Sequence, residues 1–509
     1  FVVALVQKLI YARRELRTLT PKKVKDVVGG KVLNVLKVLP GAKDKLTSEF
    51  EKVEKDLEKS LKEEGREQIF ELPSKPMSHE TIISRMEGYH AKEKSQWEDG
   101  WVSGAVYHGG VDHIEVQNKA FNLYAISNPL HPDIWPSVMK FEAEVVSMTA
   151  SFLNGGDKAV CGTMTSGGTE SILMAAKTHR QWASETKGIT NFEIVAPVTA
   201  HAGIDKACEI LNIKLVHVPV DQKTMAVNPK TLRKYVNADT IMIYASAPQY
   251  PHGIIDPVAE LGEIAQEFGC GLHVDCCLGG FVLPFAKKLG YPIPDFDFGV
   301  PGVTSMSVDT HKYGYATKGT SVVLYRNKEF RRYQYFTYPN WLGGLYVTPS
   351  TAGSRPGALS AATWASMMAM GEEGYLAATK EIMEAQRKVK EAVSKMNGIY
   401  LNGDPIAMIV AFGSKEVNVY SIADKMSKKG WSLNSLQNPP SVHICMTLRN
   451  CKVADKFIED LQQCVDECLA DPTAIDQDGS APVYGMTSSL PKGAIDTVLQ
   501  AYTDVVLKV

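Results

Sequence analysis

Two lysines stand six residues apart in the segment Ser307–Gly319, which reads SVDTHKYGYATKG. The first of them, Lys312, follows His311 directly, and most of its neighbours are small or aromatic residues. The segment comes right after the apolar run Val303–Val308. A lysine that is shielded from water gives up its proton more readily and can then act as a nucleophile. The segment therefore indicates a lysine that carries out chemistry.

An aspartate ends a second apolar run, Gly271–Asp275. If both runs are strands of a parallel sheet, Asp275 and Lys312 follow neighbouring carboxyl ends, where such sheets bind their ligands. A lysine and an aspartate placed this way suit pyridoxal 5'-phosphate (PLP). The lysine forms a Schiff base with the aldehyde, and the carboxylate keeps the pyridine nitrogen protonated. The alternative is an ordinary structural salt bridge.

A glycine-rich turn, Thr165–Ser171, reads TSGGTES and leads into a helix expected over Ile172–Ala183. Backbone N–H groups at such a helix start bind phosphate, and the hydroxyls of Thr169 and Ser171 add further donors. The turn is neither a Walker motif nor a GxGxxG motif. The alternative is a plain capped helix, which Ser, Thr and Glu also favour.

His201 lies just past the apolar run Phe192–Ala196, between the glycine-rich turn and Asp275 in the chain. An imidazole at a strand end can stack on a planar ring. The alternative is a core or capping histidine. Its place between two other candidate residues favours the functional interpretation.

Short apolar runs alternate with helical patterns from about residue 100 onward. The runs expected to be strands are Phe192–Ala196, Lys214–Val220, Thr240–Ser246, Gly271–Asp275, Val303–Val308 and Ser321–Tyr325. The helical patterns include Ser137–Leu153 and Asp256–Phe268. This alternation predicts a mainly parallel sheet that is covered on both faces.

The sequence after Gly357 predicts a smaller C-terminal α/β unit. A long helical region runs to about Met396, and the apolar runs Ile406–Phe412 and Val442–Leu448 flank a helix over Val419–Lys429. A last helix is expected over Ala454–Ala470.

The composition is that of a globular enzyme. The chain has 509 residues with 44% hydrophobic and 22% charged residues, and its formal net charge is -2. The near-neutral charge argues against nucleic acid as a main partner. The nine cysteines form no CxxC pair and no zinc pattern, which favours a reducing compartment.

The N-terminal region differs from the rest of the chain in its pattern of charged and apolar residues. Apolar residues recur at helical spacing within the charge-rich stretch Lys45–Glu64, which predicts an amphipathic helix. The chain begins with Phe1 and not with Met, so we expect a segment upstream of it. Phe1–Val6 is apolar and a basic stretch follows from Arg13 to Lys25, which suits the cytosolic side of a membrane span. A solvated helix start is the alternative.

Together these motifs carry a family resemblance. The segments TSGGTESI, HVDCCLGGF and SVDTHKYGYATKG resemble the group II, decarboxylase-like branch of the fold-type I PLP-dependent enzymes. The segments NPLHPD, PHGIIDP, AGSRPG, WSLNSLQ and YGM narrow the resemblance to the sphingosine-1-phosphate lyase family. The resemblance covers roughly residue 80 to the end of the chain.

The sequence departs from the family pattern at a few positions. Cys276, Val308 and Thr317 stand where the resemblance leads us to expect Ala, Ala and Pro, and Gly203–Ile204 replaces Ala-Phe beside His201. None of these changes removes a catalytic group.

The resemblance implies a role for each site residue. Lys312 is the Schiff-base lysine, Asp275 pairs with the pyridinium, and His201 stacks on the ring. The implied remaining contacts fall into two groups. The phosphate of the cofactor is held by His311, Gly167, Gly168, Thr169 and Ser354. The substrate and its phosphate meet Asn128, His131, Tyr107, Lys318 and Ser354, with Tyr107, Tyr250, His131 and Lys318 as candidate catalytic groups beside Lys312.

The reaction that the resemblance implies is a retro-aldol cleavage. A base removes the proton of the C3 hydroxyl of a long-chain base phosphate, and the C2–C3 bond breaks. The products are a long-chain aldehyde and phosphoethanolamine. An amino-acid decarboxylase of the same group is the first rival interpretation, but it needs no second phosphate site. A catalytically inactive scaffold is the second, and the presence of Lys312 and Asp275 argues against it.

The resemblance also implies an assembly and a location. The active site is expected at a homodimer interface, with residues from both subunits. The enzyme is expected on the endoplasmic reticulum membrane, anchored upstream of Phe1, with its catalytic domain in the cytosol. We expect three parts: a helical extension over residues 1–100, a large PLP-binding domain over 101–360, and a small α/β domain over 361–509.

Overall fold

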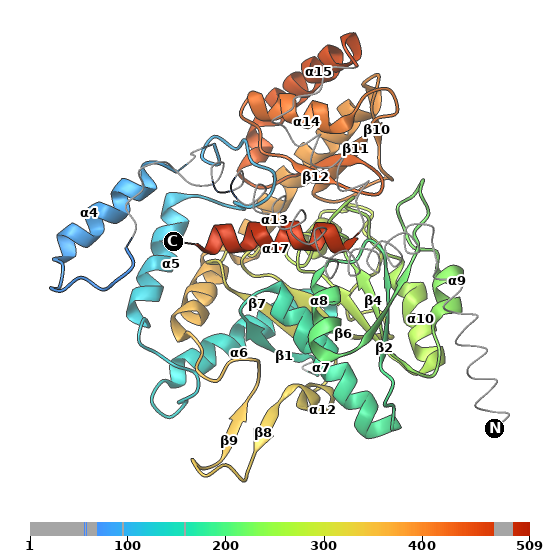
Figure 1. Cartoon of the computed structure of the whole chain (residues 1–509). Coiled ribbons are helices and arrows are strands. Elements are labelled where there is room, and N and C mark those ends of the chain that lie inside the picture. The colour runs from blue at the N-terminus through green and yellow to red at the C-terminus, as the bar shows by residue number, and fades with distance from the viewer. Residues whose placement is uncertain are drawn as a thin grey trace, which may run out of the picture. The chain divides into compact units, whose positions relative to one another are not determined.

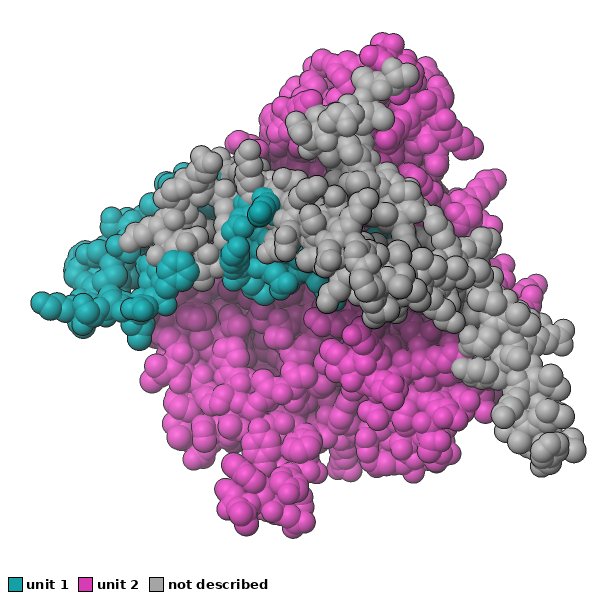
Figure 2. All heavy atoms as spheres, viewed as in Figure 1, with its two compact units in different colours: residues 1–95, 475–509 teal, residues 96–474 magenta. Residues whose placement is uncertain are grey.

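The computed structural model describes residues 55, 58, 69–93, 96–156, 159–472 and 492–508. The chain divides into two compact units, residues 1–95 with 475–509, and residues 96–474 (Figure 2). The described part of the first unit contains two helices, α4 (His79–His90) and α17 (Lys492–Leu507). Most of the expected amphipathic helix, the basic stretch behind Phe1 and the YGM motif lie outside the described residues.

The second unit is built on a seven-stranded sheet with the order β1-β7-β6-β5-β4-β2-β3 (Figure 1). The strands are β1 (Cys161–Thr165), β2 (Glu193–Pro197), β3 (Lys214–Val218), β4 (Thr240–Ser246), β5 (Gly271–Asp275), β6 (Val303–Val308) and β7 (Ser321–Tyr325). All neighbouring pairs from β6 to β3 are parallel, and β7 runs antiparallel to both of its neighbours.

The sequences of these strands are continuous apolar runs because both faces of the strands are buried. Every residue of β2, β4, β5 and β7 is buried, as expected for strands that are covered on both faces. Strands β4 to β7 have the expected bounds, and β2 and β3 differ from expectation by one or two residues at their ends. Strand β1 was not predicted because its sequence, CGTMT, offers no apolar run.

Helices precede, connect and follow the strands of this sheet. They are α5 (Val111–Leu123), α6 (Pro136–Ala150), α7 (Gly168–Lys187), α8 (Gly203–Leu211), α9 (Pro229–Leu232), α10 (Val258–Phe268), α11 (Leu283–Lys288) and α12 (Lys328–Arg331). Single turns of other helix types are η1 (Ser151–Gly155), η2 (Arg233–Tyr235), η3 (Arg332–Gln334) and η4 (Asn450–Val453). The helix expected over Asp256–Phe268 begins two residues later, after Pro257.

A long helix, α13 (Gly357–Lys395), connects the large sheet to the C-terminal part of the unit. It is kinked at Gly371, where φ is +58°, a conformation that glycine adopts at little cost. The smaller sheet has the order β10-β11-β13-β12 and is covered by α14 (Val419–Lys428) and α15 (Ala454–Ala470). Its strands are β10 (Tyr400–Leu401), β11 (Ile409–Gly413), β12 (Asn434–Leu436) and β13 (Ser441–Cys445).

A separate two-stranded hairpin, β8 (Phe336–Tyr338) and β9 (Tyr346–Thr348), extends from the large sheet region (Figure 1). Its large apolar side chains are exposed, including Trp341 and Leu342. The sequence did not predict this hairpin, because its short strands lack an apolar and polar alternation that is buried on one face.

Candidate active site

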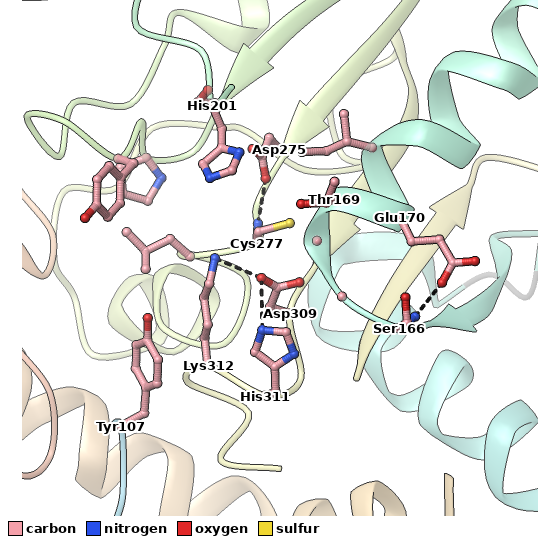
Figure 3. Close-up of a pocket in the computed structure, with 17 residues that line it drawn as sticks. Tyr107, Ser166, Thr169, Glu170, His201, Asp275, Cys277, Asp309, His311 and Lys312 are labelled. Carbon is pink, nitrogen blue, oxygen red and sulfur yellow. Dashed lines mark hydrogen bonds and ion pairs between the residues drawn. The ribbon is translucent and has the colours of Figure 1, made fainter. Parts of the chain in front are cut away.

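A cavity of about 490 Å³ lies at the carboxyl ends of the central strands (Figure 3). Ser246 ends β4, Asp275 ends β5, and Asp309 follows β6. Residues of the loops after β1 and β2 also line the cavity, as do Tyr107 and Tyr250. The chain therefore forms its cavity where parallel sheets place their ligands. Of the predicted site residues, it brings together Tyr107, Gly167, Gly168, Thr169, His201, Tyr250, Asp275, His311 and Lys312.

Lys312 points into the cavity and forms an ion pair with Asp309, with 2.8 Å between Nζ and Oδ2 (Figure 3). Burial lowers the pKa of Lys312, but the Asp309 carboxylate outweighs this effect and raises the pKa above its usual value. The expectation that apolar surroundings alone set the pKa of Lys312 is therefore wrong, because the Asp309 carboxylate has the larger effect. Asp309 holds the lysine in its charged form.

Asp275 is buried at the inner end of the cavity and accepts three hydrogen bonds. The hydroxyl of Tyr244 donates to Oδ2 at 2.5 Å, while the hydroxyl of Ser307 and the backbone N–H of Cys277 donate to Oδ1 at 3.1 and 2.9 Å. Burial by itself raises the pKa of Asp275. These donors and the nearby His201 outweigh burial, and the net shift of the pKa is downward. The carboxyl group is therefore held as a carboxylate.

The glycine-rich turn approaches the lysine segment closely. A Cβ at Gly168 would lie 2.8 Å from Cys277 Sγ and 2.9 Å from Asp309 Oδ2, so only glycine fits there. Helix α7 begins at Gly168, and its first N–H groups are not used by the helix itself. Together with Thr169 they form a cradle for an anion at the edge of the cavity.

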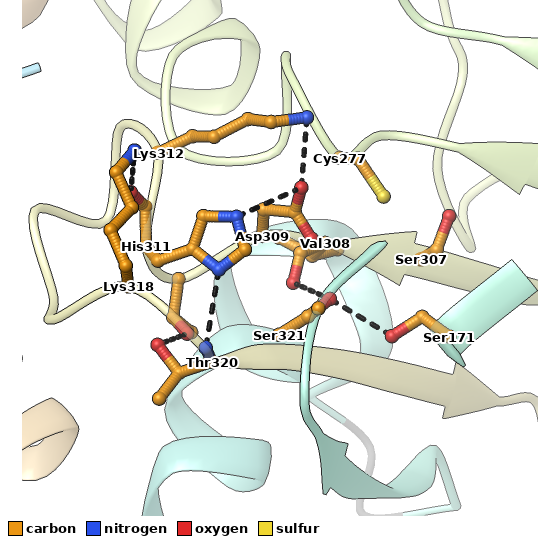
Figure 4. Close-up of polar contacts among 12 residues, drawn as sticks. Ser171, Cys277, Ser307, Val308, Asp309, His311, Lys312, Lys318, Thr320 and Ser321 are labelled. Carbon is orange, nitrogen blue, oxygen red and sulfur yellow. Dashed lines mark hydrogen bonds and ion pairs between the residues drawn. The ribbon is translucent and has the colours of Figure 1, made fainter. Parts of the chain in front are cut away.

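Ser171 does not contribute to this cradle. Its hydroxyl is buried and contacts the hydroxyl of Ser321 at 2.9 Å (Figure 4). It also contacts the hydroxyl of Thr165 at 2.6 Å. The expectation that Ser171 binds phosphate is wrong. Its hydroxyl instead ties the start of α7 to β1 and β7.

His311 and Lys318 lie beside this cradle (Figure 4). The N–H of Thr320 donates to His311 Nδ1 at 3.2 Å, and Nε2 lies 3.6 Å from Asp309 Oδ2. Lys318 Nζ donates to the backbone oxygen of His311 at 3.3 Å. Burial and the neighbouring Lys312 lower the pKa of Lys318.

A second cavity of about 250 Å³ shares Tyr107, His311 and Lys312 with the main cavity. Lys318 lines only the second cavity, where its Nζ lies 4.7 Å from the centre of the Tyr107 ring. Burial raises the pKa of Tyr107, which therefore stays a neutral phenol. Lys318 and Tyr107 thus form one cation–aromatic pair beside Lys312.

His201 is exposed toward the cavity and is held by its own loop. Its Nδ1 accepts the backbone N–H of Gly203 at 3.0 Å, which leaves the proton of the neutral ring on Nε2. A Cβ at Gly203 would lie 3.0 Å from this same Nδ1. The glycine at this position therefore gives the imidazole its room.

Tyr250 is partly exposed at the cavity and rests on a buried histidine. Its ring makes an edge contact with His443 on β13, with 4.8 Å between centres, and His443 Nδ1 lies 2.8 Å from the backbone oxygen of Pro251. Burial lowers the pKa of both His443 and the neighbouring His252 to about 4, so both rings are neutral near pH 7. The smaller sheet therefore supports one wall of the cavity.

Asn128, His131 and Ser354 do not line the main cavity of this chain. Asn128 Nδ2 donates to Ser354 Oγ at 3.0 Å, and Asn128 Oδ1 accepts the N–H groups of Leu130 and Arg355. His131 and Ser354 are exposed. The loops NPLHPD and AGSRPG thus form a polar cluster outside the main cavity, which we call the second polar cluster and which contains Asn128, His131 and Ser354.

The sequence did not single out several residues that matter to the site. Asp309 carries the ion pair with Lys312, and Tyr244 and Ser307 fix Asp275. Asp309 could have been found from its place three residues before Lys312. Tyr244 gives no such signal, because it sits inside an apolar strand.

The residues that line the cavity are of the kinds that bind PLP. A lysine, a glycine cradle at a helix start and a buried carboxylate surround one space. The conserved domain of the pyridoxal-dependent decarboxylases matches residues 108–415. Fold and site together define a PLP-dependent enzyme of this class.

Closer relatives narrow this class. A sphingosine-1-phosphate lyase of Dictyostelium discoideum is 45% identical over 489 residues, which are 96% of this chain and 92% of the relative. One of Arabidopsis thaliana is also 45% identical, over 95% of this chain and 89% of the relative. The solved structure of the Burkholderia pseudomallei lyase has a TM-score of 0.78 and 37% identity, covering 84% of this chain and 97% of that one. The chain belongs to the sphingosine-1-phosphate lyase family.

Within the part of the chain that the structure describes, no helix has the length and apolar character needed to cross a membrane.

Proposed function

We propose that the cavity residues bind PLP in the roles that the family resemblance assigns. Lys312 binds the aldehyde, Asp275 faces the pyridine nitrogen, and His201 covers the ring. Gly167, Gly168, Thr169 and His311 hold the phosphate of the cofactor. The observation that carries this proposal is the convergence of Lys312, Asp275 and the glycine cradle on one cavity. When bound, PLP supplies the electron sink for the carbanion that bond cleavage leaves behind.

The chain is a PLP-dependent lyase of the aldehyde-lyase type that acts in sphingolipid degradation. It cleaves sphingosine 1-phosphate to a long-chain aldehyde and phosphoethanolamine. The site is consistent with a phosphorylated long-chain base as the substrate. Lys318 lies near Lys312 but lines only the second cavity, so its positive charge is placed to bind a phosphate other than that of the cofactor.

The residues around Tyr107 suit the handling of a phosphorylated substrate. In this proposal Lys318 attracts the phosphate, and Tyr107, whose ring centre lies 4.7 Å from Lys318 Nζ, lines the same cavity as both lysines. Fixing the phosphate orients the bond that is to break, which is the positional effect that such catalysis requires. Tyr250 and His131 are the candidate groups that take the proton from the C3 hydroxyl, while Tyr107, as a neutral phenol, is a candidate proton or hydrogen-bond donor and Lys318 assists them.

The second polar cluster supports a shared active site. Asn128, His131 and Ser354 match the substrate motifs, yet in one chain they lie outside the main cavity. We propose that in a homodimer this cluster serves the cavity of the partner subunit. Mixing Lys312→Ala subunits with His131→Ala subunits should then restore part of the activity, since each mixed dimer keeps one complete site. Two inactive variants that stay inactive as a verified mixed dimer would contradict the shared site.

The location is proposed on the family resemblance alone: the endoplasmic reticulum membrane, with an anchor upstream of Phe1 and the catalytic domain in the cytosol. Fractionation of cells that express the full-length protein tests it. Recovery of the protein in the soluble fraction would contradict an anchor.

Replacing Lys312 tests the proposed site most directly. The variant Lys312→Ala should retain its fold but lose turnover and the visible absorbance of the lysine-bound cofactor, since no other lysine of the described residues lines the main cavity. The matched control is Lys288→Ala, which removes a half-exposed lysine paired with Glu372. Absorbance and turnover should remain in the control. A Lys312→Ala protein with the absorbance of the wild type would show that another lysine binds the cofactor.

A further inference from the structure

Asp275, which ends β5, is surrounded by polar side chains of its own and the neighbouring strands. The strand register pairs Ser246, Asp275 and Ser307 across β4, β5 and β6, and it pairs Tyr244 with His273 two residues earlier. All five side chains are buried. Three neighbouring strands therefore place polar side chains in the core around one carboxylate.

Tyr244 makes the shortest contact in this group. Its hydroxyl donates to Asp275 Oδ2 at 2.5 Å, a distance typical of a hydrogen bond from a hydroxyl to a charged oxygen. Burial raises the pKa of Tyr244, so the phenol keeps its proton and can only donate to the carboxylate. Tyr244 is fully buried and does not line the cavity, so it acts only through Asp275.

The other oxygen of the carboxylate is fixed as well. Ser307 and the Cys277 N–H donate to Oδ1, and His273 lies between the hydroxyls of Ser305 and Ser307 at 2.8 and 3.1 Å. A carboxylate has about four acceptor positions, of which three are occupied here. One acceptor position remains for a donor in the cavity.

We propose that Tyr244 is a positioning residue that keeps Asp275 ionised and oriented, and thereby keeps the proton of the cofactor pair on the pyridine nitrogen. This inference rests on the proposed role of Asp275 in binding PLP. Hydrogen bonds to a carboxylate stabilise its charged form and weaken its hold on a proton. The proton between Asp275 and the pyridine nitrogen therefore stays on the nitrogen, where it makes the ring a better acceptor of electrons.

The variant Tyr244→Phe removes one hydroxyl and leaves the ring in place. The matched control is Tyr325→Phe, because Tyr325 is equally buried in β7 and its hydroxyl contacts Gln334 and Thr178 instead. Ser307→Ala is a second test variant that removes a weaker donor from the same carboxylate. Each protein is loaded with PLP labelled with ¹⁵N in the ring, and the nitrogen resonance is recorded in the absence of substrate.

In the wild type and in Tyr325→Phe we expect the resonance of a protonated nitrogen. In Tyr244→Phe it should move toward the position of an unprotonated pyridine, and in Ser307→Ala it should move less in the same direction. A wild-type resonance in a fully loaded Tyr244→Phe protein would overturn the inference. A wild type that binds no PLP, or that holds it without a protonated nitrogen, would instead contradict the proposed site itself.

Discussion

At the scale of single residues, the pair Asp309–Lys312 controls when the lysine can react. The carboxylate lies 2.8 Å from Nζ and raises the lysine's pKa against the effect of burial. A charged amine cannot attack an aldehyde. Under the proposed role of Lys312, binding of the cofactor therefore has to compete with Asp309 for this lysine. The sequence did not predict this competition, because it depends on a distance.

The variant Asp309→Asn removes the charge that raises the pKa of Lys312, so burial should lower this pKa. At a given pH near 8, more of the lysine is then neutral, and the rate of PLP capture by the cofactor-free protein should increase. The measurement is the capture rate as a function of pH, and the profile of the variant should lie at lower pH. Coinciding profiles would contradict the role of Asp309.

The variant Asp295→Asn is the control for this experiment. It removes another carboxylate that pairs with a lysine, Lys287, but this pair is partly exposed on the surface and lies outside the cavity. The pH profile of PLP capture should be unchanged in this variant.

At the scale of elements, the start of α7 determines how closely the glycine turn can approach the lysine segment. Gly168→Ala would place a Cβ 2.8 Å from Cys277 Sγ and 2.9 Å from Asp309 Oδ2, and both partners are fixed in the core. The turn has to move away, so the cradle for the phosphate is lost. We expect the affinity for PLP to fall at least about tenfold, the equivalent of one hydrogen bond to a charged group.

Titration of the cofactor-free protein with PLP measures this affinity. Gly156→Ala is the control, because a Cβ there meets nothing within 4 Å. Equal affinities in the two variants would show that the close approach at Gly168 has no part in binding.

Most of the sheet could be predicted from the sequence because buried parallel strands are nearly continuous apolar runs. Strands β4 to β7 and helix α15 were predicted with their observed bounds. Strand β1 could not be predicted, since Gly162 and three polar or small neighbours give no strand signal. The division of residues 96–474 into a large and a small domain near residue 360 stays a prediction.

The site could be predicted in part for a similar physical reason. Asp275 and Lys312 stand at the ends of apolar runs, which gave their place in the fold before any contact was known. The support of Tyr250 by His443 joins residues far apart in the chain and has no sequence signal. Ser171 was misassigned because a hydroxyl at a helix start serves a ligand and a core contact equally well.

At the scale of the whole molecule, buried histidines make stability depend on pH. Burial lowers the pKa of several histidines to about 3 or 4, namely His179, His252, His273 and His443. In the unfolded chain histidine binds a proton near pH 6.5. The unfolded state therefore gains protons first as the pH falls, and stability is lost between about pH 6.5 and pH 4.

The size of this effect is about 3 kcal/mol for each such histidine over the whole window. Asp256 has the opposite effect on stability, because burial raises its pKa to about 7 and the folded state therefore binds its proton first as the pH falls. It is one group against four histidines, so the loss of stability at low pH prevails. The midpoint of thermal unfolding should therefore be clearly lower at pH 5 than at pH 7. His443→Gln should have a shallower pH dependence, whatever its stability at pH 7. A wild-type midpoint that is flat from pH 7 to pH 5 would contradict these shifts.

The central claim is that this cavity holds PLP and cleaves a phosphorylated long-chain base. The most direct measurement is the visible spectrum of the purified protein with PLP, followed by addition of sphingosine 1-phosphate and detection of the aldehyde. We expect the absorbance of a lysine-bound cofactor and release of a long-chain aldehyde with phosphoethanolamine. A bound cofactor with no aldehyde, together with turnover of glutamate or aromatic amino acids, would contradict the account and identify an amino-acid decarboxylase.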